Sequence, residues 1–347
     1  MPIRTIGISV LLCFFCALSG LGQAQTLSQD EDVIVFPSFA YEGKDQTVHL
    51  SFHAWVFEPE PDSLWRQSLV RSLKPFFPAG QTPEESRTLQ RRLHGFTSDN
   101  ERHKKLQVRL GSQTLDAGTT GSDGHVQTEW NLTLPGPDRA ALEAGQLSLG
   151  WDKGGQAKPL WIPRQGLSVV SDIDDTIKIT QVLDRKALIA NSFCREFQPV
   201  PGMPDLYKKL ANQAAVFHYV SASPWQLYPD LQEFVSRHFP SGTLSLRKLR
   251  WKDSSGIDFL WSDSMLYKTS TIAELMQRFP ERKFLLVGDS GEKDPDVYET
   301  IRKRFPKQIV GILIRIPPEQ KTTKRKAGME YFRDVADAEK ALKRWGL

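Results

Sequence analysis

Hydrophobic and polar residues alternate along much of the first half of the chain. A period of two indicates antiparallel strands with one face buried. Turn residues such as Ser122, Asp123 and Gly124 separate these stretches. The pattern predicts strands at 33–36, 48–56, 106–110, 126–134 and 147–151. In the longest of them, Val48, Leu50, Phe52, Ala54 and Val56 share the buried face, and His49, Ser51, His53 and Trp55 share the other.

Two helices are expected to interrupt these strands. One is predicted to begin near Asp62 and Ser63, and another after Thr82, where Glu85 completes a capping box. We therefore expect residues 25–163 to form a β-rich, sandwich-like domain with a helical insert.

Short apolar runs alternate with amphipathic helices in the rest of the chain. Strands are predicted at 167–171, 216–221, 244–249, 284–288 and 309–316, with helices near 203–212, 225–238, 267–279 and 295–305. This rhythm predicts that residues 164–347 form an α/β domain with a parallel sheet covered on both faces. Ligands bind such sheets beyond the carboxyl ends of the strands, where the strand order reverses.

The first 24 residues have the pattern of a signal peptide. Arg4 precedes an apolar core at 6–18, and small residues precede a cleavage site expected after Ala24. The alternative, an uncleaved membrane anchor, needs an apolar segment of about 20 residues. We expect an exported protein, periplasmic or secreted, with no transmembrane segment in the mature chain. Cys194 is then the mature chain's one cysteine, which excludes an intramolecular disulfide.

Composition narrows the class of protein further. The 347 residues carry a formal charge of +4, and 39% of them are hydrophobic. Such a composition excludes disorder as the main state and excludes a dedicated duplex nucleic-acid binder. If the protein binds a polyanion, it must do so through a local patch of basic residues.

Acidic residues follow the first strand of the predicted parallel sheet. Asp172 and Asp174 are two residues apart, an arrangement suited to a bound cation and to nucleophilic and acid–base chemistry. A calcium loop is excluded by spacing, because Ile177 and Leu183 stand where an EF-hand needs Gly and Glu. A solvated aspartate turn is the remaining alternative.

Three further polar clusters follow later strands or begin helices. Ser221 precedes a predicted helix, where it is either an anion ligand or a simple helix cap. Lys268 begins another helix, and its alternative is a solvated surface lysine. Asp289 and Asp294 follow a buried strand, and Asp289 is expected to meet the same cation as Asp172.

The order of these clusters is similar to the four-motif signature of the haloacid dehalogenase superfamily. More specifically, three strings resemble the actin-patch-type phosphatidate phosphatase catalytic domain family over roughly residues 160–320. The resemblance implies a haloacid dehalogenase-like, Rossmann-like fold and hydrolysis of phosphatidate to diacylglycerol and phosphate. The strings are Asp172-Ile-Asp-Asp-Thr-Ile-Lys, Ser221-Ala-Ser-Pro-Trp-Gln-Leu-Tyr and Val287-Gly-Asp-Ser-Gly-Glu-Lys-Asp-Pro-Asp-Val-Tyr.

The same resemblance implies roles for the acidic residues. Asp172 is expected to be the nucleophile that forms an aspartyl-phosphate, and Asp174 the general acid and base. A Mg²⁺ ion is expected to be held by Asp172, the Asp174 backbone carbonyl and Asp289, with Asp294 in support.

The polar residues also receive implied roles. Ser221 and Lys268 are expected to hold the phosphoryl oxygens, and Thr176 to orient the loop. The chain departs from the family pattern at Tyr267, where histidine is expected, and the stretch 253–264 looks variable. Both departures concern the choice of substrate.

An open site is expected, because no large cap fits between Thr176 and Ser221 or between Ser221 and Lys268. An open site admits a bulky ester, and an anionic phospholipid with peripheral membrane contact is the expected partner. Aromatic and basic residues could rim this face, with core or solvated positions as the alternative. They are Trp225, Trp251, Phe259, Trp261, Arg247, Lys248, Arg250 and Lys252.

Two other functions stay open on the sequence. One is the same chemistry on another phosphomonoester, such as a nucleotide or a phosphorylated polymer end. The other is a secreted lipid- or glycan-binding protein on an inactive phosphatase scaffold. His49 and His53 share a strand face but have no obvious third ligand, so we interpret them as structural or surface residues.

Overall fold

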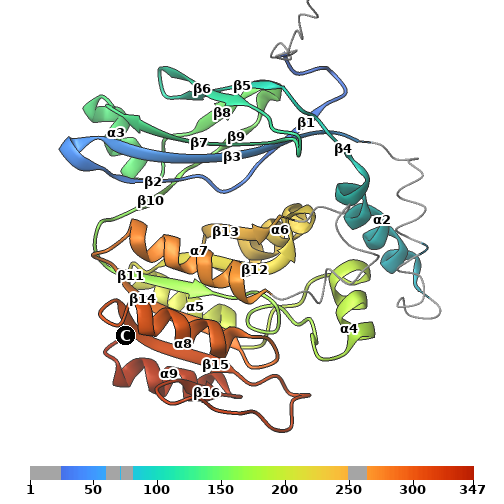
Figure 1. Cartoon of the computed structure of the whole chain (residues 1–347), viewed down its shortest axis with the longest axis vertical. Coiled ribbons are helices and arrows are strands. Elements are labelled where there is room, and N and C mark those ends of the chain that lie inside the picture. Colours follow the sequence, from blue (N-terminus) through green and yellow to red (C-terminus); the bar gives the residue numbers. More distant parts are fainter. Residues whose placement is uncertain (1–24, 60–70, 72–80, 249–263) are drawn as a thin grey trace, which may run out of the picture.

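The computed structural model describes residues 25–59, 71, 81–248 and 264–347. The expected signal peptide, the helix predicted near Asp62, and the residues Arg250, Trp251, Lys252, Phe259 and Trp261 lie outside the described residues. Figure 1 shows a strand-rich N-terminal part above an α/β C-terminal part. Among the described helices, none combines the length and apolar character that a bilayer span requires.

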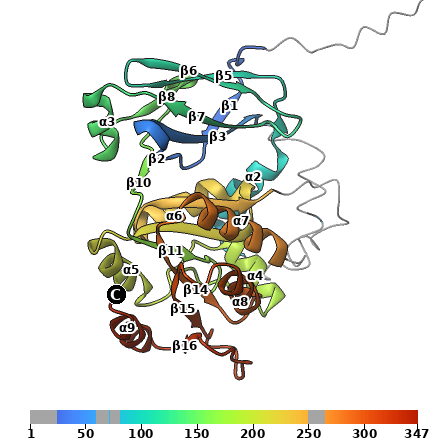
Figure 2. The same cartoon turned by 60° about the vertical axis from the view of Figure 1, so that its left-hand side comes forward.

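Two sheets form the N-terminal part, and Figure 2 shows them as separate layers. The long strand β3 (Val48–Glu58) is the centre of the first sheet and pairs antiparallel with four other strands. These are β1 (Asp32–Val35), β2 (Phe39–Glu42), β4 (Asp99–Asn100) and β7 (His125–Leu132), and β10 (Leu160–Ile162) lies beside β2. The second sheet contains β5 (Lys105–Leu110), β6 (Gln113–Thr119), β8 (Leu149–Trp151) and β9 (Gln156–Ala157).

The alternation read from the sequence describes the inner faces of these sheets. Leu50 and Phe52 of β3 and Val108 of β5 are buried in one apolar cluster between the layers. Helix α2 (Pro83–Thr97) has the predicted capping box, with Thr82 and Glu85 each accepting a hydrogen bond from the other's backbone N–H. Helix α3 (Gly136–Glu143) and the short helices η1 (Lys44–Gln46) and η3 (Asp152–Gly154) complete this part.

The sequence predicted that β3 has only one buried face. At the C-terminal end of β3, however, the other face is buried as well. Trp55 is 2% exposed and Phe57 is 6% exposed. The Trp55 ring lies edge-on to Trp225, with 4.3 Å between ring centroids. Trp225 is only 6% exposed, so it packs between the two parts of the molecule and does not rim an open face.

His49 and His53 both contact other ring side chains. The Nε2 of His53 lies 2.8 Å from the Nδ1 of His125, and His49 stacks on Tyr41. Among the described residues, neither belongs to a group of three possible metal ligands.

A six-stranded parallel sheet forms the C-terminal part. Its spatial order is β13-β12-β11-β14-β15-β16, and every neighbouring pair is parallel. The chain builds β12 and β13 on one side of β11 and then continues with β14 on the other side. The strand order therefore reverses between β11 and β14. The strands are β11 (Leu167–Ser171), β12 (Val216–Pro224), β13 (Gly242–Arg247), β14 (Lys283–Asp289), β15 (Ile309–Arg315) and β16 (Glu330–Phe332).

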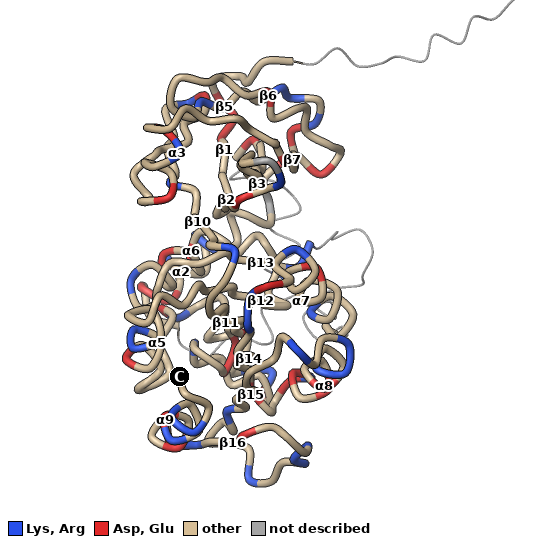
Figure 3. The backbone as a smooth tube through the Cα atoms, turned by 90° about the vertical axis from the view of Figure 1, so that its left-hand side faces the viewer, with Lys and Arg blue, Asp and Glu red and all other residues tan. Residues whose placement is uncertain are grey.

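Helices cover both faces of this sheet (Figures 1 and 2). Helices α5 (Met203–Asn212), α6 (Tyr228–His238) and α9 (Val335–Arg344) share one apolar cluster with the sheet. Helices α7 (Met265–Arg278) and α8 (Asp294–Arg304) share the cluster on the other face. Three short helices, α4 (Arg185–Ile189), η4 (Ala190–Cys194) and η5 (Trp225–Leu227), lie in the connections. Figure 3 shows acidic and basic segments interspersed over both parts.

Candidate active site

The candidate site lies where the strand order reverses. Asp172 directly follows β11, and its backbone N–H donates to the Val287 carbonyl of β14 at 2.9 Å. Asp289 is the last residue of β14. Because parallel strands end at the same edge of the sheet, these two carboxylates meet in the position typical of ligand sites in such folds.

Asp172 is buried and held from both sides. Its Oδ1 lies 2.8 Å from the Lys268 Nζ, and its Oδ2 accepts a hydrogen bond from the Thr176 hydroxyl at 3.2 Å. Burial raises the pKa of Asp172 well above its usual value, the neighbouring carboxylates add to this rise, and the Lys268 charge opposes it. Thr176, which was expected to orient the loop, thus contacts the Asp172 carboxylate itself.

Asp174 is surrounded by hydrogen-bond donors. Its Oδ1 lies 2.7 Å from the Lys178 Nζ and accepts from the Thr180 hydroxyl at 2.8 Å. Its Oδ2 accepts from the hydroxyls of Ser221 at 3.1 Å and Ser223 at 2.8 Å. Burial alone would raise the pKa of Asp174, but the Lys178 charge and these hydrogen bonds lower it below its ordinary value. Asp174 is therefore an ionised carboxylate in this state.

Lys268 lies at the start of α7 and is 1% exposed, so it is not a solvated surface lysine. Its Nζ contacts Asp172, Glu292 at 2.8 Å and Asp294 at 2.7 Å. Burial opposes the lysine charge, but the three carboxylates raise its pKa well above the usual value. Lys268 is thus a fixed positive charge beside Asp172.

Three carboxylates could hold a cation. Oxygen atoms of Asp172, Asp289 and Glu292 lie within 4.8 Å of one another. Asp289 Oδ2 accepts the Gly291 N–H at 2.6 Å, whereas the buried Asp289 Oδ1 has no hydrogen-bond partner among the described residues. Buried carboxylate oxygens are costly unless paired, and Mg²⁺ prefers oxygen ligands, so the donor set fits this ion.

Asp294 has contacts that differ from those expected of a metal ligand. Its Oδ1 accepts from Lys268, and its Oδ2 accepts the backbone N–H of Asp289 at 3.1 Å. Asp294 therefore positions the lysine and the loop after β14. Glu292, to which the sequence reasoning gave no role, takes the place beside Asp289 and Asp172.

The loop after Asp174 is organised by Asp175. Its backbone has a φ of 51°, and its carboxylate accepts the backbone N–H groups of Thr180, Gln181 and Val182 at 2.7 to 2.8 Å. Arg315 of β15 donates to the Asp175 carbonyl at 2.5 Å. These bonds fix the turn that brings Thr180 onto Asp174.

Sequence reasoning missed Lys178, Thr180, Ser223, Glu292 and Arg315. The first four lie within six residues of predicted site residues, and Lys178, Ser223 and Glu292 also stand within the three strings that resemble the family. Arg315 ends a strand that carried no predicted motif.

A small pocket of about 40 Å³ opens at Asp174, with Thr180, Ser192, Ser223 and Glu292 among its lining residues. No large cap covers it among the described residues, although α4 and η4 lie between Thr176 and Ser221.

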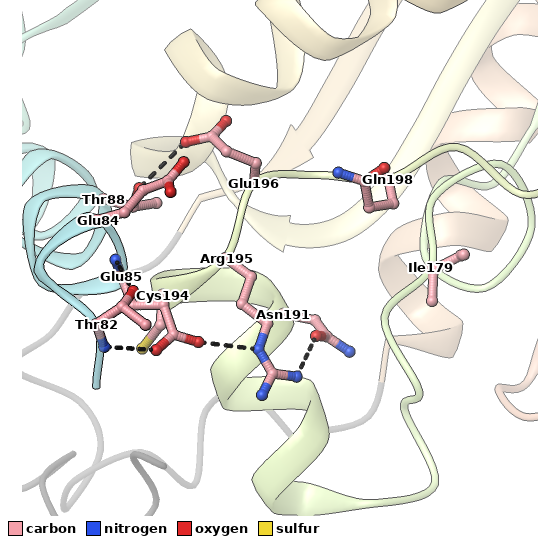
Figure 4. A pocket seen from close by; sticks show the side chains of 10 residues that line it. All are labelled: Thr82, Glu84, Glu85, Thr88, Ile179, Asn191, Cys194, Arg195, Glu196 and Gln198. Carbon is pink, nitrogen blue, oxygen red and sulfur yellow. Dashed lines mark hydrogen bonds and ion pairs between the residues drawn. The ribbon is translucent and has the colours of Figure 1, made fainter. Parts of the chain in front are cut away.

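Helix α2 of the N-terminal part packs against η4, which the sequence did not predict. The Thr88 hydroxyl donates to Glu196 at 3.1 Å, and Arg195 donates to Glu85 at 3.2 Å. Between them lies a second pocket of about 330 Å³, drawn in Figure 4. Its lining contains none of the carboxylates that surround Lys268, so it is separate from the candidate site. The lining residues are Thr82, Glu84, Glu85, Thr88, Ile179, Asn191, Cys194, Arg195, Glu196 and Gln198.

Comparisons with known proteins place this site in a family. Residues 167–316 match the family described as phosphatidate phosphatase APP1, catalytic domain. Phosphatidate phosphatase APP1 of Saccharomyces cerevisiae is 33% identical over 244 residues, which are 67% of this chain and 41% of the yeast protein. An uncharacterized Schizosaccharomyces pombe protein is 30% identical over 158 residues, or 44% of this chain and 26% of that protein. The chain thus spans less than half the length of the curated relatives it matches.

Solved structures with some likeness include two phosphatases. A class C acid phosphatase from Bacillus anthracis is 14% identical, with a TM-score of 0.28 over 52% of this chain and 78% of that one. A probable phosphoserine phosphatase from Vibrio cholerae is 12% identical, with a TM-score of 0.28 over 81% of this chain and 95% of that one.

The family match contains the carboxylate cluster, Lys268 and the serines around Asp174, from the start of β11 to just beyond β15. Through residues 167–316, the chain belongs to the phosphatidate phosphatase APP1 catalytic domain family.

Proposed function

We propose that this protein is a Mg²⁺-dependent phosphatidate phosphatase that releases diacylglycerol and phosphate through an aspartyl-phosphate. The observation that carries the proposal is the placement of Asp172 between Lys268 and Thr176, with Asp174 two residues away. The yeast relative, whose name gives phosphatidate phosphatase activity, supports the choice of substrate.

Asp172 supplies the nucleophile in this mechanism. One carboxylate oxygen attacks phosphorus while the bond from phosphorus to the diacylglycerol oxygen breaks. The Lys268 ammonium and the Thr176 hydroxyl hold the carboxylate in one orientation. Lys268 also offsets negative charge when the phosphoryl group approaches.

Asp174 moves the proton in both half-reactions. It gives a proton to the departing diacylglycerol oxygen, and afterwards takes one from the water that attacks the aspartyl-phosphate. Because the Lys178 charge and the hydroxyl donors hold the pKa of Asp174 below its ordinary value, Asp174 must take up a proton from solvent when the substrate binds. A phosphate dianion close to Asp174 raises its pKa, which favours that uptake.

The residues that would hold Mg²⁺ are Asp172, Asp289 and Glu292, with the unpartnered Asp289 Oδ1 as the strongest indication. When bound, the ion supplies charge that stabilises the phosphoryl oxygens and lets the Asp172 carboxylate approach them. Ser221 and Ser223 each donate to the Asp174 Oδ2, and in this mechanism their hydroxyls bind oxygens of the phosphoryl group once it enters the site.

Export is part of the proposal, because residues 1–24 have the pattern of a signal peptide. Cell fractionation with N-terminal sequencing tests it, and we expect a mature chain that begins at Gln25. A cytoplasmic chain with its first residues intact would contradict export without affecting the proposed chemistry.

Substrate preference is tested by assaying the mature protein on phosphatidate in mixed micelles, on nucleotides and on a chromogenic phosphate. We expect turnover of phosphatidate that stops with a chelator and returns with Mg²⁺. A preference for nucleotides would replace the lipid assignment with another phosphomonoester. No turnover of any ester with Mg²⁺ would indicate a binding protein on an inactive scaffold.

A further inference from the structure

A further pocket, of about 430 Å³, lies between the N-terminal and C-terminal parts. Phe36, His53 and Gln127 line it from the N-terminal part. The other wall comes from α7, from the end of β13 and from Trp225. Figures 1 and 2 show α7 on the side of the C-terminal part that faces the N-terminal part. Interfaces between domains are common places for small ligands to bind.

The walls of this pocket combine apolar, polar and basic side chains. Phe36 and Trp225 are aromatic and almost fully buried. Arg247 brings a positive charge, and Gln127 and Thr271 bring hydrogen-bonding groups from the two opposite walls. Such a lining suits an organic group that has both hydrocarbon and hydrogen-bond acceptors.

The pocket adjoins the small pocket at Asp174. Pro224 lines the small pocket and pairs in register with Arg247, which lines the large one. Trp225, which follows Pro224 directly, also lines the large pocket. Glu292 lines the small pocket, and its charge opposes the lowering of the Arg247 pKa by burial. The two pockets therefore meet where Pro224 and Arg247 lie side by side.

Size and chemistry divide a substrate between the two pockets. The pocket at Asp174, of about 40 Å³, has room for little more than one small group. In the proposed mechanism Asp174 gives its proton to the departing oxygen, so the leaving group must lie next to Asp174. The large pocket is the adjoining space that can receive the rest of the leaving group.

We propose that the pocket between the two parts binds the glycerol-ester portion of the leaving group, so that the N-terminal part forms one wall of the substrate site. The assignment rests on the proposed function, because a phosphatidate carries two ester groups on the glycerol whose oxygen departs. Arg247 donates to an ester carbonyl, and Phe36 and Trp225 contact the first methylene groups of an acyl chain. The N-terminal part thereby takes part in the choice of substrate.

Dibutyrylglycerol is the probe for this pocket, because it is a soluble diacylglycerol with no phosphate. Isothermal titration calorimetry of the intact protein measures its binding. We expect binding that inorganic phosphate and Mg²⁺ do not displace, because phosphate occupies the pocket at Asp174. The absence of binding, or displacement of the probe by phosphate, would overturn the proposal.

Two variants narrow the pocket from opposite walls. Gln127→Trp adds a bulky ring from the N-terminal part, and Thr271→Trp adds one from α7. Each should weaken binding of the probe at least about ten-fold, because the added ring competes with the ligand for space. Because Gln127 is exposed on β7, its replacement leaves the apolar cores intact.

Matched controls are Gln107→Trp on β5 and Ser270→Trp on α7. Both residues are exposed, and neither lines the pocket. These variants should bind the probe like the unaltered protein. Circular dichroism and melting curves establish that each variant is folded. Folded Gln127→Trp and Thr271→Trp variants that bind the probe as tightly as their controls would overturn the proposal.

Activity separates this proposal from the proposed function. Gln127→Trp should lower kcat/KM on soluble dibutyryl phosphatidate at least about ten-fold more than on a chromogenic phosphate, mainly through KM. If phosphatidate is cleaved but probe binding does not depend on Gln127 and Thr271, the pocket assignment is wrong and the function stands. If probe binding depends on these residues but no phosphatidate is cleaved, the proposed function is wrong and the pocket remains a diacylglycerol site.

Discussion

Replacing Arg92 with alanine tests whether helix α2 supports the candidate site. The Arg92 side chain is 1% exposed. Its Nη1 donates to the carbonyls of Arg195 at 2.6 Å and Ser192 at 3.2 Å, and its Nε lies 3.0 Å from Asp230. Its guanidinium also lies 3.7 Å from the centre of the Phe197 ring. One side chain of the N-terminal part thus holds the end of η4 in the C-terminal part.

The loss of stability can be worked out from these contacts. Two carbonyls lose their donor, at about 1–3 kcal/mol each when they stay buried. Asp230 keeps a partner, because the Arg91 Nη2 lies 2.7 Å from the same oxygen. Burial lowers the pKa of Arg92, so removing it also recovers some desolvation cost. We expect Arg92→Ala to lower the free energy of unfolding by about 2–5 kcal/mol, mainly because the two carbonyls lose their donor.

Arg91→Ala is the matched control. Arg91 neighbours Arg92 and binds the same aspartate, but its side chain is 53% exposed. Exposed ion pairs contribute about 0–1 kcal/mol, so this variant should unfold almost like the unaltered protein. Urea unfolding followed by circular dichroism measures both changes. Equal unfolding midpoints for the two variants would refute the assignment of Arg92 as the main link between α2 and η4.

Activity gives a second readout of the same link. Asn191 of η4 donates to the Thr180 carbonyl at 3.1 Å, and the Thr180 hydroxyl donates to Asp174. Displacement of η4 should therefore misplace the Asp174 carboxylate. We expect kcat on a soluble phosphate ester to fall in folded Arg92→Ala while KM changes less, because Arg92 touches no substrate.

Asp172→Asn should abolish turnover with the fold intact, because an amide cannot attack phosphorus; an active, folded variant would contradict the mechanism. Asp174→Asn should retain Mg²⁺ binding but lower kcat by about 10²–10⁴-fold, measured at saturating metal. Burial between Ser168 and Thr243, with a smaller contribution from a nearby arginine, lowers the pKa of His218 to about 3. A depressed histidine pKa favours unfolding as pH falls, so stability should decrease by about 1.4 kcal/mol per unit from about pH 6.5 towards 3. Urea unfolding at several pH values should show that the stability of His218→Gln depends less steeply on pH. An unchanged pH dependence would count against the assignment.

Much of the C-terminal part could be predicted from the sequence. Short apolar runs bounded by polar residues mark buried parallel strands, and their ends must share one edge of the sheet. Asp172 and Asp289 are therefore expected to lie together before any contact is known. In the structure their carboxylate oxygens lie within 4.8 Å of each other, and Lys268 is buried beside Asp172.

The different contacts made by Glu292 and Asp294 could not be predicted from the sequence. Glu292 and Asp294 lie three and five residues after Asp289. Which of them faces Asp172 depends on the turn before α8, where Gly291 donates to Asp289. Spacing along the chain does not encode the direction in which a side chain leaves such a turn.

The contacts between the N-terminal and C-terminal parts also could not be predicted from the hydrophobic pattern. Alternation in β3 correctly separates two faces, but it cannot show that the outer face is covered elsewhere in the fold. The alternation places Trp55 on the outer face, and in the structure this side chain packs on Trp225. Likewise, no feature of α2 indicated that Arg92 would bind carbonyls about a hundred residues later.

The placement of the lysines leaves one buried carboxylate oxygen for the proposed cation. Lys178 pairs with Asp174, and Lys268 pairs with Asp172 and Asp294. Each acid that these lysines hold is therefore positioned without a metal ion. Among the described residues, Asp289 receives no such cation, and its Oδ1 is buried without a partner. Since a buried carboxylate oxygen is costly when unpaired, the proposed divalent ion would supply the partner that this oxygen lacks.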